Sequence, residues 1–535
     1  MEMYDLIIKD TTIIDGSGDP GFKGSIGIKE GKITLLPVDT EDRAEKIMDG
    51  NGLVTCPGFI DSHSHGDMIL GTHFGSLAKI NQGITTQVTG MCSYSLFPVS
   101  EKYCKTWIDN CYLTLPETGA PEEMGTFTSA SNYFNYAQKL AIPENVRPLV
   151  GSGALRCAVM GDESREPTST ELMEMKALLK EAMEAGAAGM STGLIYLPST
   201  YELPAEITEL AKIVASYGGV YTTHIRNEST KSIDAIKEAI EVARETGVRL
   251  IISHHKLQGK ACWGMSKETI ELMEEANDEG LDVSCDQYPY TACMSLLADC
   301  CPSKYYSEGL SGIVNYLENP ITREKIHQEM MDEHTDYENY YINSGGWSGI
   351  YIASSYRLPE AANKTIQEYA DETGMDPFDA YCKIMIANDG AVGAIYYTMC
   401  DEDLTRIIKY KNTAVCTDGL LKSGHDMTHP RAYASFPHAI RVFVKEKQLF
   451  SLEEMIRKMT SFTADRYYMK TKGLIKNGYD ADILIFDYDK LTDKASYSEP
   501  TLLCEGFKAV IVGGKIVYEN QHLTGENPGR ILLMR

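Results

Sequence analysis

Short apolar runs rich in β-branched residues alternate with longer amphipathic segments along most of the chain. Amphipathic helices are predicted at Thr168–Ala187, Lys231–Thr246 and Ser266–Gly280. Eight runs have the length and bounding turns of buried strands, and they are Leu53–His65, Ile84–Cys92, Val146–Ala154, Gly189–Tyr196, Gly219–Arg226, Arg249–Lys256, Leu281–Tyr290 and Thr413–Gly419.

Alternation of strands and helices predicts right-handed parallel crossovers, and eight strands are the number that closes a (β/α)8 TIM barrel. An open doubly wound sheet is the alternative architecture, but no Gly-rich phosphate loop follows a strand. Gly151-x-Gly153 lacks the third glycine and is more typical of an ordinary loop. We therefore predict an α/β protein with a catalytic (β/α)8 barrel over residues 56–472.

The two ends of the chain and one long interval depart from this alternation. Residues 1–55 and 473–535 both consist of short β-like segments separated by turns such as Gly513-Gly514, so together they predict one small β-sandwich. A long, Tyr- and Trp-rich interval separates barrel strands 7 and 8. It predicts an inserted subdomain at approximately 293–357, in the position of a lid over the barrel mouth.

The amino-acid composition of the chain argues mainly against nucleic-acid and membrane partners. The chain has 50 Lys and Arg against 76 Asp and Glu, a net charge of −26, and no Lys/Arg stripe, so we expect no nucleic-acid partner. No apolar run reaches ~18 residues and no leader pattern opens the sequence, so we expect no membrane partner. The 14 Cys follow no disulfide spacing, which is typical of reduced thiols and predicts a cytoplasmic protein.

Candidate chemistry begins at Asp61-Ser62-His63-Ser64-His65, which closes the first predicted strand. Because side chains alternate faces along a strand, His63 and His65 are expected on one face, about 7 Å apart, where both can bind one metal ion. A polar strand end gives the same pattern, so the hypothesis depends on further ligands.

Further candidate ligands lie at the ends of other predicted strands, where barrel enzymes place their chemistry. Each alone also fits a buried core side chain or a turn, but in strand order they jointly predict a metal site. Imidazole, thiolate and carboxylate donors favour zinc over magnesium or calcium. Asp418 is then placed to act as general base towards a zinc-activated water. The candidate ligands after the first strand are Cys92, His224, His254 or His255, and Asp418.

These motifs resemble the amidohydrolase superfamily and, within it, the D-aminoacylase (N-acyl-D-amino-acid deacylase) family. The resemblance implies zinc-dependent hydrolysis of the amide bond of a small-molecule N-acyl-D-amino acid, giving a D-amino acid and a carboxylate. In this family a Cys bridges where many relatives use a carboxylated Lys, and Gly189–Tyr196 contains no Lys. The resemblance covers nearly the whole chain, through Pro57-Gly58-Phe59-Ile60-Asp61-x-His-x-His, Ser191-Thr192-Gly193-x-x-Tyr196, Thr223-His224-x-Arg226, Ser253-His254-His255-Lys256, Tyr288-Pro289-Tyr290 and Thr417-Asp418-Gly419.

The resemblance also implies a role for each matching residue. One tightly bound Zn²⁺ is expected on Cys92, His224 and His254. A weaker second position is expected on His63, His65, Cys92 and Asp418, with Asp418 as the catalytic acid and base. Arg431 is expected to bind the substrate carboxylate through its bidentate fork, and Tyr196, Lys256 and Tyr288 are expected to help hold the same end or the scissile carbonyl. Lys256 also lies two residues after His254, which puts both on one face of a strand.

Two alternatives stay open at this point. One is another amidohydrolase that acts on cyclic amides or D-dipeptides. The other, of a different class, is a non-catalytic amidohydrolase-like scaffold, although the complete set of ligands speaks against it. The sequence leaves open the preferred acyl chain and amino-acid side chain, the strictness of D-selectivity, the occupancy of the second metal position and whether the chain forms a homo-oligomer.

Overall fold

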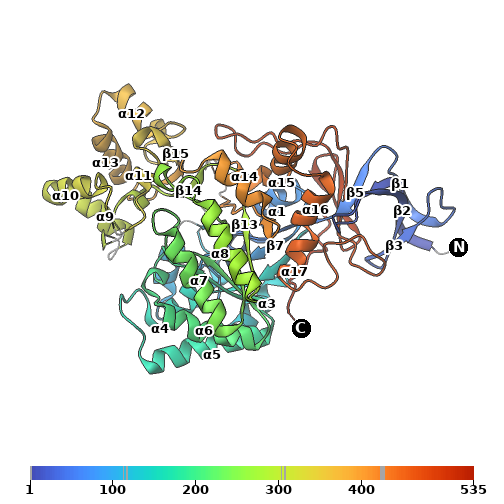
Figure 1. The fold of residues 1–535 in the computed structure, drawn as a ribbon, viewed down its shortest axis with the longest axis horizontal. Helices are drawn as coiled ribbons and strands as arrows, with labels where there is room; N and C mark the ends of the chain where they lie inside the picture. The colour runs from blue at the N-terminus through green and yellow to red at the C-terminus, as the bar shows by residue number, and fades with distance from the viewer. Residues whose placement is uncertain are drawn as a thin grey trace.

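The computed structural model describes residues 3–111, 114–115, 119–302, 304–305, 309–335, 337–421 and 428–534. Figure 1 shows an elongated molecule with N-terminal strands at one end and the helices α9 (Gly309–Glu318) to α13 (Pro377–Ala387) at the other. A body of strands wrapped by helices lies between them. No helix in the described part of the chain is long and apolar enough to cross a bilayer.

Two parallel sheets form the central body. β6 (Phe59–Asp61), β7 (Ile84–Thr89) and β8 (Asn145–Pro148) make one sheet, and the other has the strand order β17-β13-β12-β11-β10-β9. The sheets adjoin at both edges, because only Leu149 separates β8 from β9 and a parallel bridge joins Ser64 to Gly419. The strands of the second sheet are β9 (Val150–Gly151), β10 (Gly189–Gly193), β11 (Val220–His224), β12 (Arg249–Ile252), β13 (Val283–Gln287) and β17 (Thr413–Val415).

The helices between these strands begin and end where the sequence provides caps. α5 (Ser169–Ala185) starts with a capping box, in which the Thr168 side chain accepts from the Glu171 backbone and the Glu171 side chain accepts from the Thr168 N–H. It ends at Gly186, whose left-handed φ of 108° few other residues adopt. α7 (Ser232–Thr246) and α8 (Ser266–Asp278) also lie where helices were predicted.

The strands end earlier than the sequence pattern indicates. The predicted strand Leu53–His65 is in fact two strands, because β5 (Val54–Pro57) joins a different sheet from β6. Gly58 separates them, and a Cβ at Gly58 would lie only 2.1 Å from Thr85 Oγ1. The predicted strand Val146–Ala154 likewise ends early, because α4 begins at Ser152. The prediction of one continuous first strand is therefore wrong.

Strands from both chain ends share one nine-stranded sheet, in which β5 pairs with β18. A common core of isoleucines from both ends, including Ile8, Ile26, Ile483 and Ile511, holds it together. The strands are β1 (Met3–Ile13), β2 (Phe22–Lys29), β3 (Lys32–Leu36), β4 (Arg43–Asp49), β5, β18 (Ile483–Phe486), β19 (Phe507–Val512), β20 (Lys515–Glu519) and β21 (His522–Leu523).

A fourth sheet lies between β13 and β17 in the sequence and has the order β14-β16-β15. β14 (Cys293–Leu296) pairs with β16 (Gly393–Tyr396), and β15 (Ile350–Ser354) covers the other edge of β16. The aromatic residues of this segment, such as Trp347 and Tyr381, pack into its own hydrophobic core.

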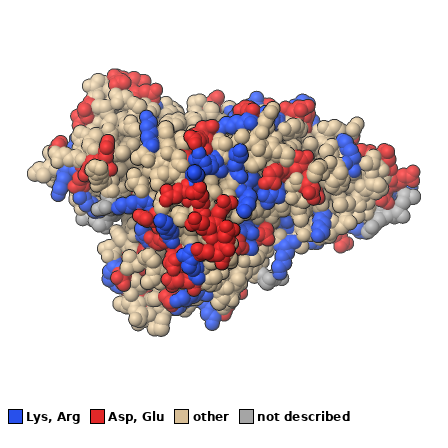
Figure 2. All heavy atoms as spheres, in the orientation of Figure 1, with Lys and Arg blue, Asp and Glu red and all other residues tan. Residues whose placement is uncertain are grey.

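The acidic side chains gather on the outer helices. Figure 2 shows a dense acidic area over α8, which exposes Glu268, Glu271, Glu274, Glu275 and Asp278. This part of the net negative charge therefore faces solvent on a helix surface rather than the strand ends, which agrees with a role in solubility.

Candidate active site

The predicted metal ligands lie at or just beyond strand ends rather than within the strands. His63 follows the end of β6 and His224 is the last residue of β11. Cys92, His254 and Asp418 all have a left-handed backbone, with φ of 51°, 35° and 45°. Few non-glycine residues adopt this conformation, which is often found at functional sites. Loop geometry, and not the alternation of side chains along strands, therefore aims these three side chains.

These side chains converge on the Cys92 thiol. Its Sγ lies 3.3 Å from His63 Nε2, 3.3 Å from His254 Nε2 and 3.9 Å from His224 Nδ1. A tetrahedral zinc ion with bonds of about 2.0–2.3 Å separates its donors by roughly 3.3–3.8 Å. The distances therefore suit ligands that share a zinc ion.

A second group of donors surrounds Asp418. Its Oδ1 lies 3.3 Å from His65 Nε2 and 3.7 Å from His63 Nε2. The ligand atoms of His63, His65 and Asp418 all lie within 4.8 Å of one another, as do those of His63, Cys92 and His254. Because His63 belongs to both groups, the two positions are adjacent.

The electrostatics of the cluster suit a cation. Burial raises the pKa of the Cys92 thiol well above its usual value, and the negative charge of Asp418 raises it further. Burial also lowers the pKa of His224, to about 3, so its imidazole is neutral and able to bind a metal. A thiolate is stable in this buried site only beside a positive charge, which a bound zinc ion supplies.

Arg431 is the main cation of the pocket and is only 2% exposed. Its Nη2 lies 3.0 Å from Asp418 Oδ2, and the guanidinium carbon lies 4.4 Å from the centre of the Tyr288 ring. Arg431 Nε and Nη1 have no hydrogen-bond partner among the described residues. Buried donors without partners are costly, so this edge of the guanidinium suits an anion that enters the pocket.

The same guanidinium determines the charge of Asp418. Burial by itself raises the pKa of a carboxyl group, but Arg431, followed by His254 and His65, outweighs this effect and holds the Asp418 pKa well below its usual value. Asp418 is therefore a carboxylate at neutral pH, as a proton acceptor must be.

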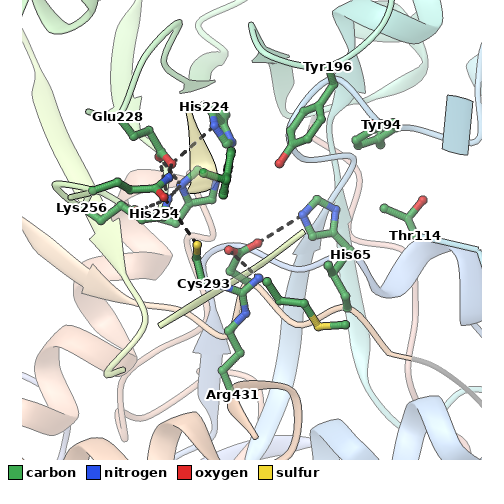
Figure 3. Close-up of a pocket in the computed structure, with 15 residues that line it drawn as sticks. His65, Tyr94, Thr114, Tyr196, His224, Glu228, His254, Lys256, Cys293 and Arg431 are labelled. Carbon is green, nitrogen blue, oxygen red and sulfur yellow. Dashed lines mark hydrogen bonds and ion pairs between the residues drawn. The ribbon is translucent and has the colours of Figure 1, made fainter. Parts of the chain in front are cut away.

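Other predicted residues lie around this pocket (Figure 3). Lys256 and Tyr196 line it, and the Tyr196 ring lies 5.1 Å from that of His224. Tyr288 lies behind Arg431 and is not among the lining residues. His255 faces away, with its Nε2 2.8 Å from Thr269 Oγ1. Of the loop between Asp418 and Arg431, residues 422–427 lie outside the described residues.

Glu228 is a site residue that the sequence analysis missed. It is 1% exposed, and its carboxylate lies 2.6 Å from Lys256 Nζ and 3.1 Å from His254 Nδ1. The available signal was its position four residues after His224, but an acidic loop residue is usually solvated. Its burial against two ligands depends on the tertiary fold.

Known proteins with similar sequences and folds include amidohydrolases. A model of the amidohydrolase family matches residues 418–518. The chain is 33% identical over 530 residues to the N-acyl-D-aspartate deacylase of Alcaligenes xylosoxydans xylosoxydans. The alignment covers 99% of this chain and 95% of that protein.

Two solved structures are similar over their whole length. N-acyl-D-glutamate deacylase from Bordetella bronchiseptica, in complex with zinc and a phosphonate mimic of the tetrahedral intermediate, is 30% identical with a TM-score of 0.83. A D-aminoacylase described as having a binuclear metal centre is 32% identical, also with a TM-score of 0.83. Each match covers 99% of this chain and 100% of the other.

Proposed function

This chain belongs to the amidohydrolase family, in its N-acyl-D-amino-acid deacylase (D-aminoacylase) group, and we propose that it hydrolyses the amide bond of N-acyl-D-amino acids with the help of zinc. The products are a D-amino acid and a carboxylate. The observation that carries this function is the buried cluster of imidazole, thiolate and carboxylate groups beside Arg431, whose Nε and Nη1 lack partners.

In this proposal Cys92, His224 and His254 hold the tightly bound zinc, as the family resemblance implies, and both imidazoles present a ring nitrogen to Cys92 Sγ, at 3.9 and 3.3 Å. His63, His65, Cys92 and Asp418 offer the second, weaker position. When bound, zinc polarises the scissile carbonyl and makes water a nucleophile at neutral pH.

The chain's own groups orient the substrate and move the proton. Arg431 binds the substrate carboxylate, and the ring of Tyr288 packs against the guanidinium group of Arg431. Tyr196 and Lys256 line the same pocket and are assigned to the scissile carbonyl. Asp418 accepts a proton from the attacking water and donates it to the departing amine nitrogen.

We also propose the finer architecture. The strands of the two parallel sheets close into one (β/α)8 barrel, with β8 and β9, which only Leu149 separates, counted as one of the eight; the contacts at both edges of the sheets support this. Residues 1–55 and 473–535 form the small β domain, and residues 56–472 the catalytic barrel. The inserted subdomain, predicted at approximately 293–357, extends to Tyr396 if the pairing of β14 with β16 defines it. The absence of a disulfide among the 14 Cys supports a cytoplasmic location.

Replacing Arg431 with Ala should raise KM for N-acyl-D-amino acids by on the order of 10- to 100-fold, because a charge-assisted hydrogen bond to the substrate is lost. The measurement is steady-state kinetics on an N-acetyl-D-amino acid and on its carboxamide, which lacks the carboxylate. The carboxamide should bind equally poorly to both enzymes. An unchanged KM for the acid would discard the assignment of Arg431.

A further inference from the structure

We propose that Glu228 is a positioning residue for the metal centre, acting through the outer nitrogens of His224 and His254. A histidine that binds a metal through one ring nitrogen carries its proton on the other, and a carboxylate that accepts this proton fixes the ring. Loss of such a partner typically weakens metal binding 10- to 100-fold. Glu228 lies where one carboxylate serves two ligands.

The distances around both imidazoles have this arrangement. His254 presents Nε2 to Cys92 Sγ at 3.3 Å and Nδ1 to Glu228 Oε1 at 3.1 Å. His224 presents Nδ1 to the same sulfur at 3.9 Å and Nε2 to Glu228 Oε2 at 3.5 Å. Each ring therefore has one nitrogen towards Cys92 and the other towards Glu228, and Figure 3 shows the contacts of both rings with Glu228.

Lys256 balances the charge of this carboxylate. Its Nζ donates to Glu228 Oε1 at 2.6 Å and to the backbone oxygen of His254 at 3.0 Å. The same ammonium lies 2.8 Å from His254 Nδ1, so that nitrogen contacts both Lys256 and Glu228. Because an unpaired buried carboxylate is costly, Lys256 makes it possible for Glu228 to stay ionised behind the ligands.

The inserted segment holds Glu228 in place from the other side. Gln258 Nε2 donates to Glu228 Oε2 at 3.0 Å and to Glu338 Oε1 at 2.7 Å, and the Glu228 N–H donates to Glu338 Oε2 at 3.0 Å. Burial, and then the negative charge of Glu228, raises the pKa of Glu338 to about 8. Glu338 is thus largely protonated at neutral pH and adds little second negative charge.

Glu228→Gln tests this proposal, because it keeps the size of the side chain and removes the charge. We expect the dissociation constant for zinc, measured by competition with a chromogenic chelator, to rise 10- to 100-fold. Glu338→Gln makes the same replacement of a carboxyl group by an amide one residue further from the ligands, where little charge is lost, and should shift this constant much less. In cobalt-substituted enzyme, the thiolate-to-cobalt absorption of Cys92 should also shift in Glu228→Gln only.

Two results would overturn the proposal. Unchanged zinc affinity in folded Glu228→Gln would mean that Glu228 does not position the ligands. Equal losses in both variants would point to general packing of the buried acids. If Glu228→Gln does not fold, Gln258→Ala, which leaves the carboxylate but removes one of its donors, should weaken zinc binding in the same direction. Wild-type affinity in that variant would then count against the proposal.

A separate observation, a cavity of about 580 Å³ beside the metal pocket, carries a second inference. The cavity shares the tyrosines Tyr94, Tyr196 and Tyr340 with the metal pocket. Its walls also include Leu194, Ile195 and Leu296, whereas Asp418 and Arg431 line only the metal pocket. The cavity therefore adjoins the metal pocket on the side of Tyr94, Tyr196 and Tyr340 and not at Asp418 and Arg431.

We infer that this cavity receives the acyl group of the substrate and favours large, uncharged acyl chains. The inference rests on the proposed function, in which Arg431 binds the carboxylate of the amino-acid half and Asp418 donates a proton to its nitrogen, so that the acyl half extends past Tyr196. Arg226 on the cavity wall is paired with Glu238 at 2.8 Å, and Lys304 with Glu329 at 2.8 Å. These cations are already neutralised, while the leucine and tyrosine side chains offer apolar contact.

The experiment compares N-acetyl-, N-butanoyl-, N-hexanoyl- and N-benzoyl-D-alanine. We expect kcat/KM to rise about threefold to fourfold per added methylene, and Leu296→Trp to lower the ratio of hexanoyl to acetyl activity. A flat acyl series with active N-acetyl substrate would overturn this inference and leave the proposed function intact. If kcat/KM rises instead with the size of the amino-acid side chain, the cavity would be assigned to that side chain. No hydrolysis of any member would contradict the function itself.

Discussion

An Asp418→Ala enzyme is expected to lose turnover by on the order of 10²- to 10⁴-fold, the usual contribution of a general acid and base, while its zinc stoichiometry stays near wild type. Asp418 belongs to the weaker metal position, where its Oδ1 contacts His65, and its Oδ2 contacts Arg431. The ligands of the tight position, Cys92, His224 and His254, are untouched by the change. Single-turnover kinetics and zinc analysis on the same preparation make the measurement.

The exposed Asp389 provides a control, because Asp389→Ala removes a carboxylate that is paired with Arg357 and is 63% exposed in its side chain. It should keep both activity and zinc. Turnover that survives in Asp418→Ala would place the base elsewhere. Loss of the tight zinc together with activity would mean that Asp418 is chiefly a ligand.

Cys92→Ala is expected to lose both the tightly bound zinc and the activity. The thiol lies 3.3 Å from His63 Nε2 and from His254 Nε2, so the change removes the donor that both positions share. Outer partners of ligands are worth about 10- to 100-fold in metal affinity, and we expect a direct ligand to cost more than ~100-fold. Zinc content after gel filtration and the chelator-competition constant measure this loss.

Cys157→Ala is the matched control, since Cys157 is also buried and free but lies in α4 (Ser152–Met160). It should bind zinc like the wild type. If Cys92→Ala retains one zinc per chain and hydrolyses substrate, the thiol is not the bridging ligand, and the arrangement of the two metal positions must be redrawn.

The family, the reaction class and the zinc cofactor were predictable from sequence because several independent motifs agreed, and the full-length relatives confirm them. The six proposed ligands also lie together in the structure. Strand-end positions predicted their convergence, since parallel strands bring their carboxyl ends to one edge, and the family resemblance chose His254 over His255.

The local geometry was harder to predict. The apolar pattern continues past the last hydrogen bond of each strand, so strand ends were placed too late. Nothing in the residue types of Cys92, His254 and Asp418 announces their left-handed backbone. The predicted shared face of His254 and Lys256 does lead both into the pocket, but through a loop beyond β12 rather than along a strand.

Contacts between distant segments lay beyond sequence reasoning altogether. Glu228 resembles any acidic loop residue until the fold buries it between His224 and Lys256. The unpaired edge of Arg431 is likewise a property of its tertiary surroundings. β14 pairs with β16, although several helices lie between the two strands in the sequence. This pairing makes the inserted segment longer than predicted.

The most direct test of the central claim is hydrolysis of matched enantiomers by zinc-loaded enzyme. N-acetyl derivatives of D- and L-leucine, aspartate and glutamate cover neutral and acidic side chains, and acetate and free amino acid are both quantified. We predict equimolar acetate and D-amino acid from at least one D-substrate, a much slower reaction with its L-enantiomer, and loss of activity on chelation that zinc reverses. Absence of acetate release from every D-substrate, or equal rates for both enantiomers, would contradict the account.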